Sequence, residues 1–145
     1  MHGLELRDTR GFVQQLKCLL QDDNPMVVAN SIAALVEIEG PCGDIIDSRS
    51  LSKILASLDA CTEYVYRCLL RACLSFLCRW GQITILNCLT AYVCSDEREC
   101  DAIMECVVPK LQHANYAVVF ACVRLVLSKL NVLEVCFVGI QSIPS

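Results

Sequence analysis

Apolar residues along this chain recur with the period of an α-helix, and two kinds of predicted helix alternate. In the first kind the apolar side chains form one stripe opposite a polar face, as on a surface helix. In the second kind nearly every position is apolar, so the helix must be covered on most sides. The striped helices are predicted over residues 12–21, 51–60 and 95–111, and the apolar helices over residues 25–38, 80–93 and 116–130.

Capping residues mark several of these boundaries. Asn24 suits the N-cap of the first apolar helix, and Pro25 suits its first helical position. Gly40, followed by a proline, is typical of the end of that helix. Ser95 or Asp96 can cap the third striped helix, whose first turn is acidic and therefore favours the positive end of the helix dipole.

The capped apolar helices reveal an internal repeat. Asn115 lies 91 residues after Asn24, which is too far for two ordinary helix-pair repeats. Removing residues 64–79 leaves two repeats of 37 to 38 residues and makes Thr62 the missing cap between them. Pro109 should kink or end the helix in which it falls. Repeats of about 40 residues, each with one striped and one buried helix, predict an all-α solenoid of the HEAT/armadillo type with about three helix pairs.

Composition narrows the class of protein. Apolar residues make up 55% and charged residues 19% of the 145, which excludes a disordered chain. The net charge of −4 argues against a nucleic-acid-binding surface. Mean hydropathy is high at +0.50, yet the longest uncharged stretch, residues 80–95, is shorter than the roughly 20 residues that span a bilayer. We therefore expect no transmembrane helix, and the amino-terminal residues show no signal-peptide pattern.

Twelve cysteines would suit a disulfide scaffold in a short secreted chain. Here the long predicted helices and the ample apolar content favour cysteines used as small buried residues in a reducing compartment. No Cys-x-x-Cys pair is present, and His2 and His113 lie far from any paired thiols, so we predict no metal site. A cysteine-based enzyme or a zinc protein is the alternative interpretation.

Candidate catalytic and binding groups are few. His113 is interpreted as a helix-end residue, and the acidic pairs near residues 97–105 as a solvated face, so we predict no enzyme and no cofactor. Trp80 is expected to pack between repeats, with a partner contact as its alternative role. Three arginines within residues 64–79 would share one helix face and could lie on an anionic membrane, although a foreign translated segment is the preferred interpretation.

Three motifs occur in order along the chain: the first begins with Asn24 and Pro25, the second with Trp80, and the third with Pro109. Together they resemble the trunk of the beta-adaptins, large subunits of clathrin adaptor complexes. The resemblance covers residues 8–63 and 80–130. The residues that carry it, which we interpret as structural, are Asn24, Pro25, Val27, Val28, Asn30, Trp80, Gly81, Gln82, Pro109, Asn115, Val118 and Val119.

The sequence departs from the family's pattern in two segments. The pattern runs directly from Cys-Thr-Glu into Trp-Gly-Gln, so residues 64–79 are expected to be an insertion, and residues 131–145 to be a divergent tail. The chain also covers only about three repeats and lacks the clathrin-binding hinge and the ear. We therefore expect residues 1–145 to be one fragment of an adaptin trunk, from a gene model that retained intron sequence.

The resemblance implies a structural subunit in vesicle-mediated protein transport. In that family the trunk holds the other large, the medium and the small adaptor subunits and helps the complex respond to membranes, small GTPases and cargo signals. Clathrin would bind only through regions outside this chain. The implied location is cytoplasmic, on coated vesicles at the trans-Golgi network and endosomes or at plasma-membrane coated pits. A fragment that does not assemble is the alternative, and neither the particular complex nor the partner-contact residues follow from the motifs.

Overall fold

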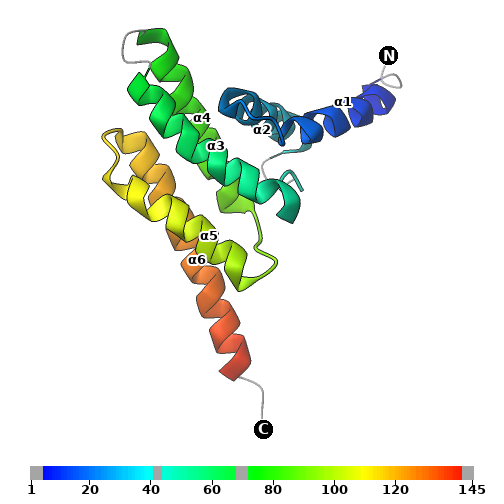
Figure 1. Ribbon diagram of the computed structural model, residues 1–145. Coiled ribbons are helices and arrows are strands. Elements are labelled where there is room, and N and C mark those ends of the chain that lie inside the picture. Colours follow the sequence, from blue (N-terminus) through cyan, green and yellow to red (C-terminus); the bar gives the residue numbers. More distant parts are fainter. Residues whose placement is uncertain (1–4, 41–43, 68–71, 142–145) are drawn as a thin grey trace.

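The computed structural model describes the backbone of residues 5–40, 44–67 and 72–141, and the side chains of residues 9–40, 44–61 and 80–131. Within these ranges the chain is helical and contains no strand (Figure 1). The elements are α1 (Glu5–Leu19), α2 (Pro25–Glu39), α3 (Ser48–Arg67), α4 (Ala72–Ala91), α5 (Glu97–Val107), the 3-10 helix η1 (Val108–Gln112) and α6 (Tyr116–Gln141).

Successive helices form three hairpins that stack side by side. The helix α1 pairs with α2, α3 with α4, and α5 with η1 and α6 (Figure 1). The apolar helices α2, α4 and α6 form one layer, because α4 packs on both of the others. The striped helix α3 contacts α5 in a second layer. This arrangement confirms the predicted all-α solenoid of about three helix-pair repeats.

One hydrophobic core runs through all three hairpins. Its members come from both layers and are shielded almost completely from water. The fully buried members with the largest side chains are Leu20, Ile32, Leu35, Ile54, Leu58, Ile85, Leu86, Leu89, Ile103 and Leu125. The stack is therefore held by continuous apolar contact between neighbouring repeats, as in other solenoids.

Side-chain caps lie where the sequence predicts them. Asn24 Oδ1 accepts a hydrogen bond from the Met26 amide at 2.9 Å, and Asn115 Oδ1 accepts from the Ala117 amide at 2.9 Å. Of the two candidates at the third striped helix, Asp96 is the cap. The structure also places Gly40 at φ +84°, the left-handed region that favours glycine at a helix end.

The predicted end of α3 and the predicted start of α4 are wrong. The sequence predicts that α3 ends near residue 60 and that α4 begins at Trp80, but α3 continues to Arg67 and α4 begins at Ala72. Thr62 therefore lies inside α3 and does not cap a helix in this chain. Residues 64–79 contain no glycine or proline, so α3 can extend to Arg67 and α4 can begin as early as Ala72. Their side chains lie outside the described residues.

Other boundaries differ less. The helix α5 ends at Val107, and η1 follows with Pro109 in its first turn, so the predicted effect of that proline is confirmed. The helix α1 begins at Glu5, earlier than the predicted residue 12. The helix α6 continues beyond residue 130 to Gln141, so part of the predicted divergent tail is helical. None of the described helices combines the length and apolar character needed to cross a membrane.

Candidate interaction surfaces

The Trp-Gly-Gln motif lies where α4 packs on α2. A Cβ atom placed on Gly81 would lie 3.1 Å from Ala29 Cβ, so the missing side chain allows the two helices to approach closely. Gln82 is fully buried beside it. Trp80, by contrast, keeps 44% of its surface exposed. The motif thus fixes the α2–α4 contact and leaves a large aromatic ring at its edge.

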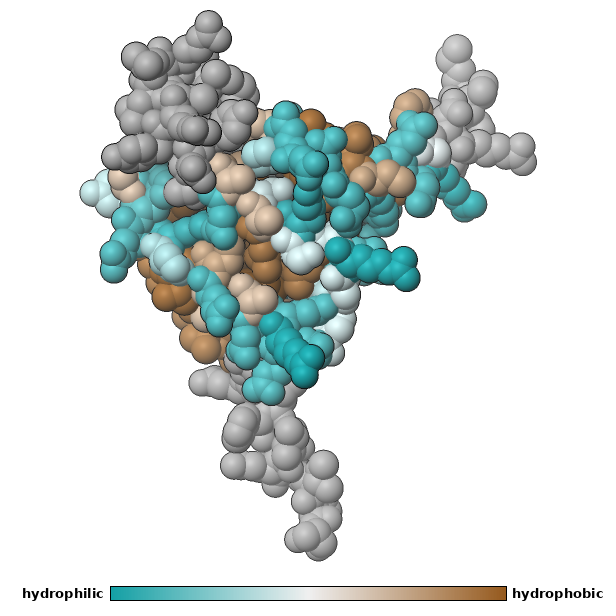
Figure 2. Space-filling model, viewed as in Figure 1, coloured by the Kyte–Doolittle hydropathy of each residue, from teal (hydrophilic) through white to brown (hydrophobic). Residues whose placement is uncertain are grey.

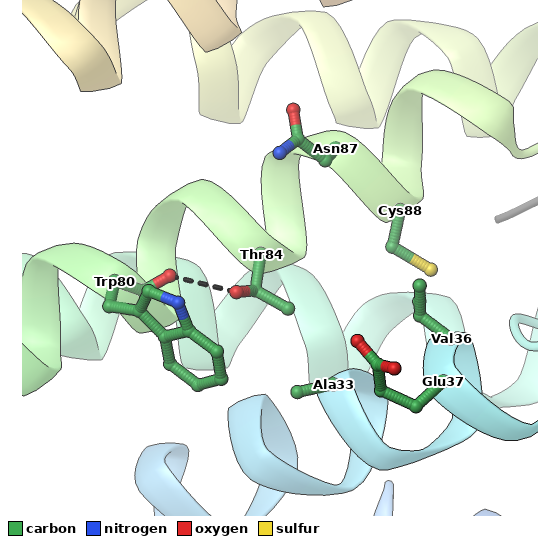
Figure 3. Close-up of a pocket in the computed structure, with 7 residues that line it drawn as sticks. All are labelled: Ala33, Val36, Glu37, Trp80, Thr84, Asn87 and Cys88. Atoms are coloured by element: carbon green, nitrogen blue, oxygen red, sulfur yellow. Dashed lines mark hydrogen bonds between the residues drawn. The ribbon is translucent and has the colours of Figure 1, made fainter.

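Trp80 borders a groove of about 200 Å³ between α2 and α4. In Figure 3 the indole ring and the carboxylate of Glu37 lie on either side of the Ala33 side chain. Thr84 Oγ1 donates to the Trp80 carbonyl oxygen at 2.9 Å, which positions the threonine along the groove. The complete lining is Ala33, Val36, Glu37, Trp80, Thr84, Asn87 and Cys88. Trp80 therefore lies at the edge of the groove between two repeats and remains accessible.

A second surface runs along the outer face of α6. Five large apolar side chains recur there at intervals of three and four residues and therefore share one face of the helix. Their exposed fractions range from 40% to 88%. They are Tyr116, Phe120, Val123, Leu127 and Leu130. In Figure 2 apolar surface borders α5 and α6 on the side away from α1 and α2. An exposed apolar stripe of this kind is typical of a protein contact.

Polar contacts join the third hairpin to the second. Lys110 on η1 is 8% exposed, and its ammonium group lies 2.5 Å from the carboxylate of Asp59 on α3. Lys129 on α6 is buried and donates to the Tyr92 carbonyl oxygen. Desolvation by burial lowers the pKa of Lys129, although the nearby Cys94 opposes this effect. The ammonium groups of both lysines are thus paired with acceptors of the second hairpin, so they do not indicate a ligand site.

Four of the seven described cysteines belong to the buried interior, while Cys18 is exposed and Cys94 and Cys106 are half-buried. Cys61, Cys88, Cys100 and Cys122 are buried. Burial raises the pKa of the Cys88 thiol to about 11 and that of Cys106 to about 12, so both stay protonated at neutral pH. A catalytic cysteine needs the opposite shift, because the thiolate is the nucleophile. Among the described residues, no three His, Cys, Asp or Glu side chains are grouped closely enough to hold a metal ion.

His113 follows η1 as a helix-end residue. Its Nδ1 atom accepts a hydrogen bond from the Asn115 amide at 3.0 Å. Because Asn115 caps α6, the histidine stabilises the turn between η1 and α6. The ring thus has a local structural role in the connection, in agreement with the interpretation of the sequence.

The structure distributes the family-motif residues over all three hairpins and does not gather them into one site. Pro25, Val28, Gly81, Gln82 and Val118 are buried, Val27, Asn115 and Val119 are half-buried, and Asn30, Trp80 and Pro109 are exposed. Sequence reasoning missed Glu37 as a groove residue and missed the apolar stripe on α6. The three- and four-residue spacing from Tyr116 to Leu130 was the available signal, but exposure could not be read from it.

A family model described as Cnd1, non-SMC mitotic condensation complex subunit 1, matches residues 4–128. The chain belongs to this family. Its sequence is also similar to adaptor subunits. It is 40% identical to AP-1 complex subunit beta-1 of Homo sapiens over 134 residues, which is 90% of this chain and 12% of the human protein.

Two further relatives are also AP-1 beta subunits. Identity to AP-1 complex subunit beta of Dictyostelium discoideum is 40% over 88% of this chain, and identity to AP-1 complex subunit beta-1 of Saccharomyces cerevisiae is 35% over 86%. The resemblance to the beta-adaptins is therefore confirmed. This chain spans only 12% to 16% of the lengths of these relatives.

Proposed function

We propose that this chain acts as part of the trunk of an adaptor-complex beta subunit in vesicle-mediated intracellular protein transport. The observation that carries the proposal is the 40% identity to AP-1 beta subunits over about 90% of the chain. The Cnd1 description names a condensation complex subunit, but the curated relatives at this identity are adaptor subunits. The action proposed is assembly through non-covalent contacts, without a chemical reaction.

The solenoid supports this role physically. Its three hairpins share a continuous core, so the stack presents stiff surfaces on which partners can dock. The apolar stripe on α6 is exposed at the third hairpin, where another helical repeat or subunit can pack. The expected partners are the other large, the medium and the small adaptor subunits. The expected location is cytoplasmic, with the complex bound peripherally to coated vesicles, trans-Golgi network, endosomes or coated pits.

We further propose that residues 64–79 are an insertion and residues 131–145 a divergent tail. The hairpin of α3 and α4 supports the insertion, because each of these helices has 20 residues while α1 and α2 have 15. Transcript reads that join the Glu63 codon directly to the Trp80 codon would agree with an insertion. Abundant reads that carry residues 64–79 would contradict an origin in retained intron sequence.

Co-purification tests the proposed function. The chain, and a version without residues 64–79, are each co-expressed with the large, medium and small partner subunits of AP-1. Recovery of partners by either version supports the trunk role. Leu89→Asp, which places a charge in the fully buried core of α4, provides the unfolded control. If neither version recovers a partner while both fold, the chain is a non-assembling fragment.

A further inference from the structure

We propose that the groove between α2 and α4 binds an arginine side chain carried by an extended segment of a partner protein. This goes beyond the proposed function, because assembly of a trunk does not require any particular ligand in this groove. Three observations support it: a carboxylate, that of Glu37, with no ion pair among the described residues, an accessible indole ring and a space of side-chain size. Each lies on the lining shown in Figure 3.

The carboxylate of Glu37 makes the groove favourable for a cation. Glu37 and Glu39 both lie in the last turn of α2, where the helix dipole is negative and acidic side chains are unfavourable. Lys17 neutralises Glu39 across an N–O distance of 3.4 Å. Glu37 has no such ion pair among the described residues, and the last turn of α2 contains no basic residue. A cation from a partner would therefore neutralise Glu37 and interact favourably with the negative end of the α2 dipole.

The aromatic ring and the size of the space fit a guanidinium group. Trp80 offers the face of an indole, which attracts cations and stacks well on the planar guanidinium. The groove volume of about 200 Å³ is smaller than the roughly 300–1,000 Å³ of small-molecule pockets, so it suits one side chain. Ala33 and Val36 line the groove and can pack against the methylene groups of the arginine stem.

The remaining lining favours an extended segment over a helix, because the backbone N–H and C=O groups inside a helix already bond to each other, and the net charge disfavours a second copy. Asn87 is exposed at the edge of the groove, where its amide can bond to a peptide backbone. A second copy of this chain would bring a like net charge of −4. A basic peptide is instead attracted to the chain over a longer range.

The experiment uses the intrinsic fluorescence of Trp80, the only tryptophan in the chain. The full chain is titrated at low salt with a ten-residue glycine- and serine-rich peptide that contains one central arginine. A peptide of the same length with citrulline in its place keeps the shape and removes the charge. We expect a saturable change in Trp80 emission with the arginine peptide, and binding about fivefold weaker with citrulline.

Variants of the chain locate the site. Glu37→Gln should weaken arginine binding about fivefold, and Glu105→Gln on α5, an exposed carboxylate far from the groove, should leave it unchanged. Trp80→Leu, measured by the anisotropy of a labelled peptide, should also weaken binding. Circular dichroism confirms that each variant folds. Equal affinity for the citrulline peptide, or full affinity in Glu37→Gln, would overturn the proposal. So would a Trp80 emission that depends on protein concentration without peptide, because a second copy would then cover the groove.

Discussion

The ion pair between Asp59 and Lys110 gives a sharp prediction because its two partners are buried to different extents. The Lys110 side chain is 8% exposed, whereas that of Asp59 is 62% exposed. Asp59→Asn leaves the ammonium group in its buried position without a carboxylate. Breaking a fully buried pair costs about 3–5 kcal/mol, and we expect about 2–3 kcal/mol here because one partner reaches water. Lys110→Met keeps the apolar stem and leaves an aspartate that water can solvate, so its cost should stay within about 1 kcal/mol.

Urea unfolding at pH 7, followed by far-UV circular dichroism, measures both variants and the double variant. The double variant should be more stable than Asp59→Asn alone, because the buried charge is gone. Asp101→Asn on the exposed face of α5 serves as the matched control and should change stability little. If Lys110→Met proves more destabilising than Asp59→Asn, unequal burial of the two side chains does not determine the cost of breaking this ion pair.

Three further predictions concern capping, ionisation and the α3–α4 hairpin. Asn24→Ala should lower the free energy of unfolding by about 1 kcal/mol, because the Met26 amide loses its hydrogen-bond partner. Asn30→Ala changes an exposed position of the same helix, and an equal loss of stability in that variant would contradict the capping role of Asn24. The pKa of Cys88 is raised from 9.0 to about 11, so the unfolded thiol ionises first and stability should fall as pH rises from 9 toward 11. The loss should reach about 2–3 kcal/mol and shrink in Cys88→Ala; an unchanged pH dependence in that variant would count against it. Deleting residues 64–79 should raise stability by about 1 kcal/mol through a restored cap at Thr62, and calorimetry showing a lower melting temperature would mean that the segment is a genuine part of the repeat.

The fold was predictable because the helix signals are local. Asn24 and Asn115 each bond an amide two residues ahead, so the sequence around each cap contains the whole interaction. Pro109 acts through its own ring and missing amide hydrogen, which is equally local. The alternation of striped and apolar helices then requires the apolar ones to be covered by neighbours, and α4 is covered by both α2 and α6.

The features that the sequence did not predict correctly depend on contacts between distant residues or on a segment without a helix-stop signal. The end of α3 and the start of α4 were misplaced because an internal repeat, and not a helix breaker, suggested the boundary at Thr62. The groove could not be predicted because Glu37 and Trp80 lie far apart in sequence and line one groove only when α4 packs on α2. Gly81 allows that approach, but a glycine within an apolar run does not by itself reveal its partner Ala29.

The proposed role as a segment of an adaptor beta-subunit trunk can be tested within the complex itself. Its most direct test replaces the matching 134-residue segment of human AP-1 complex subunit beta-1 with the corresponding part of this chain. The chimaera is then co-purified with the other AP-1 subunits. We expect a stable complex, because the exposed helix faces should pack on the neighbouring repeats. A chimaera that folds but recovers none of those subunits would contradict it.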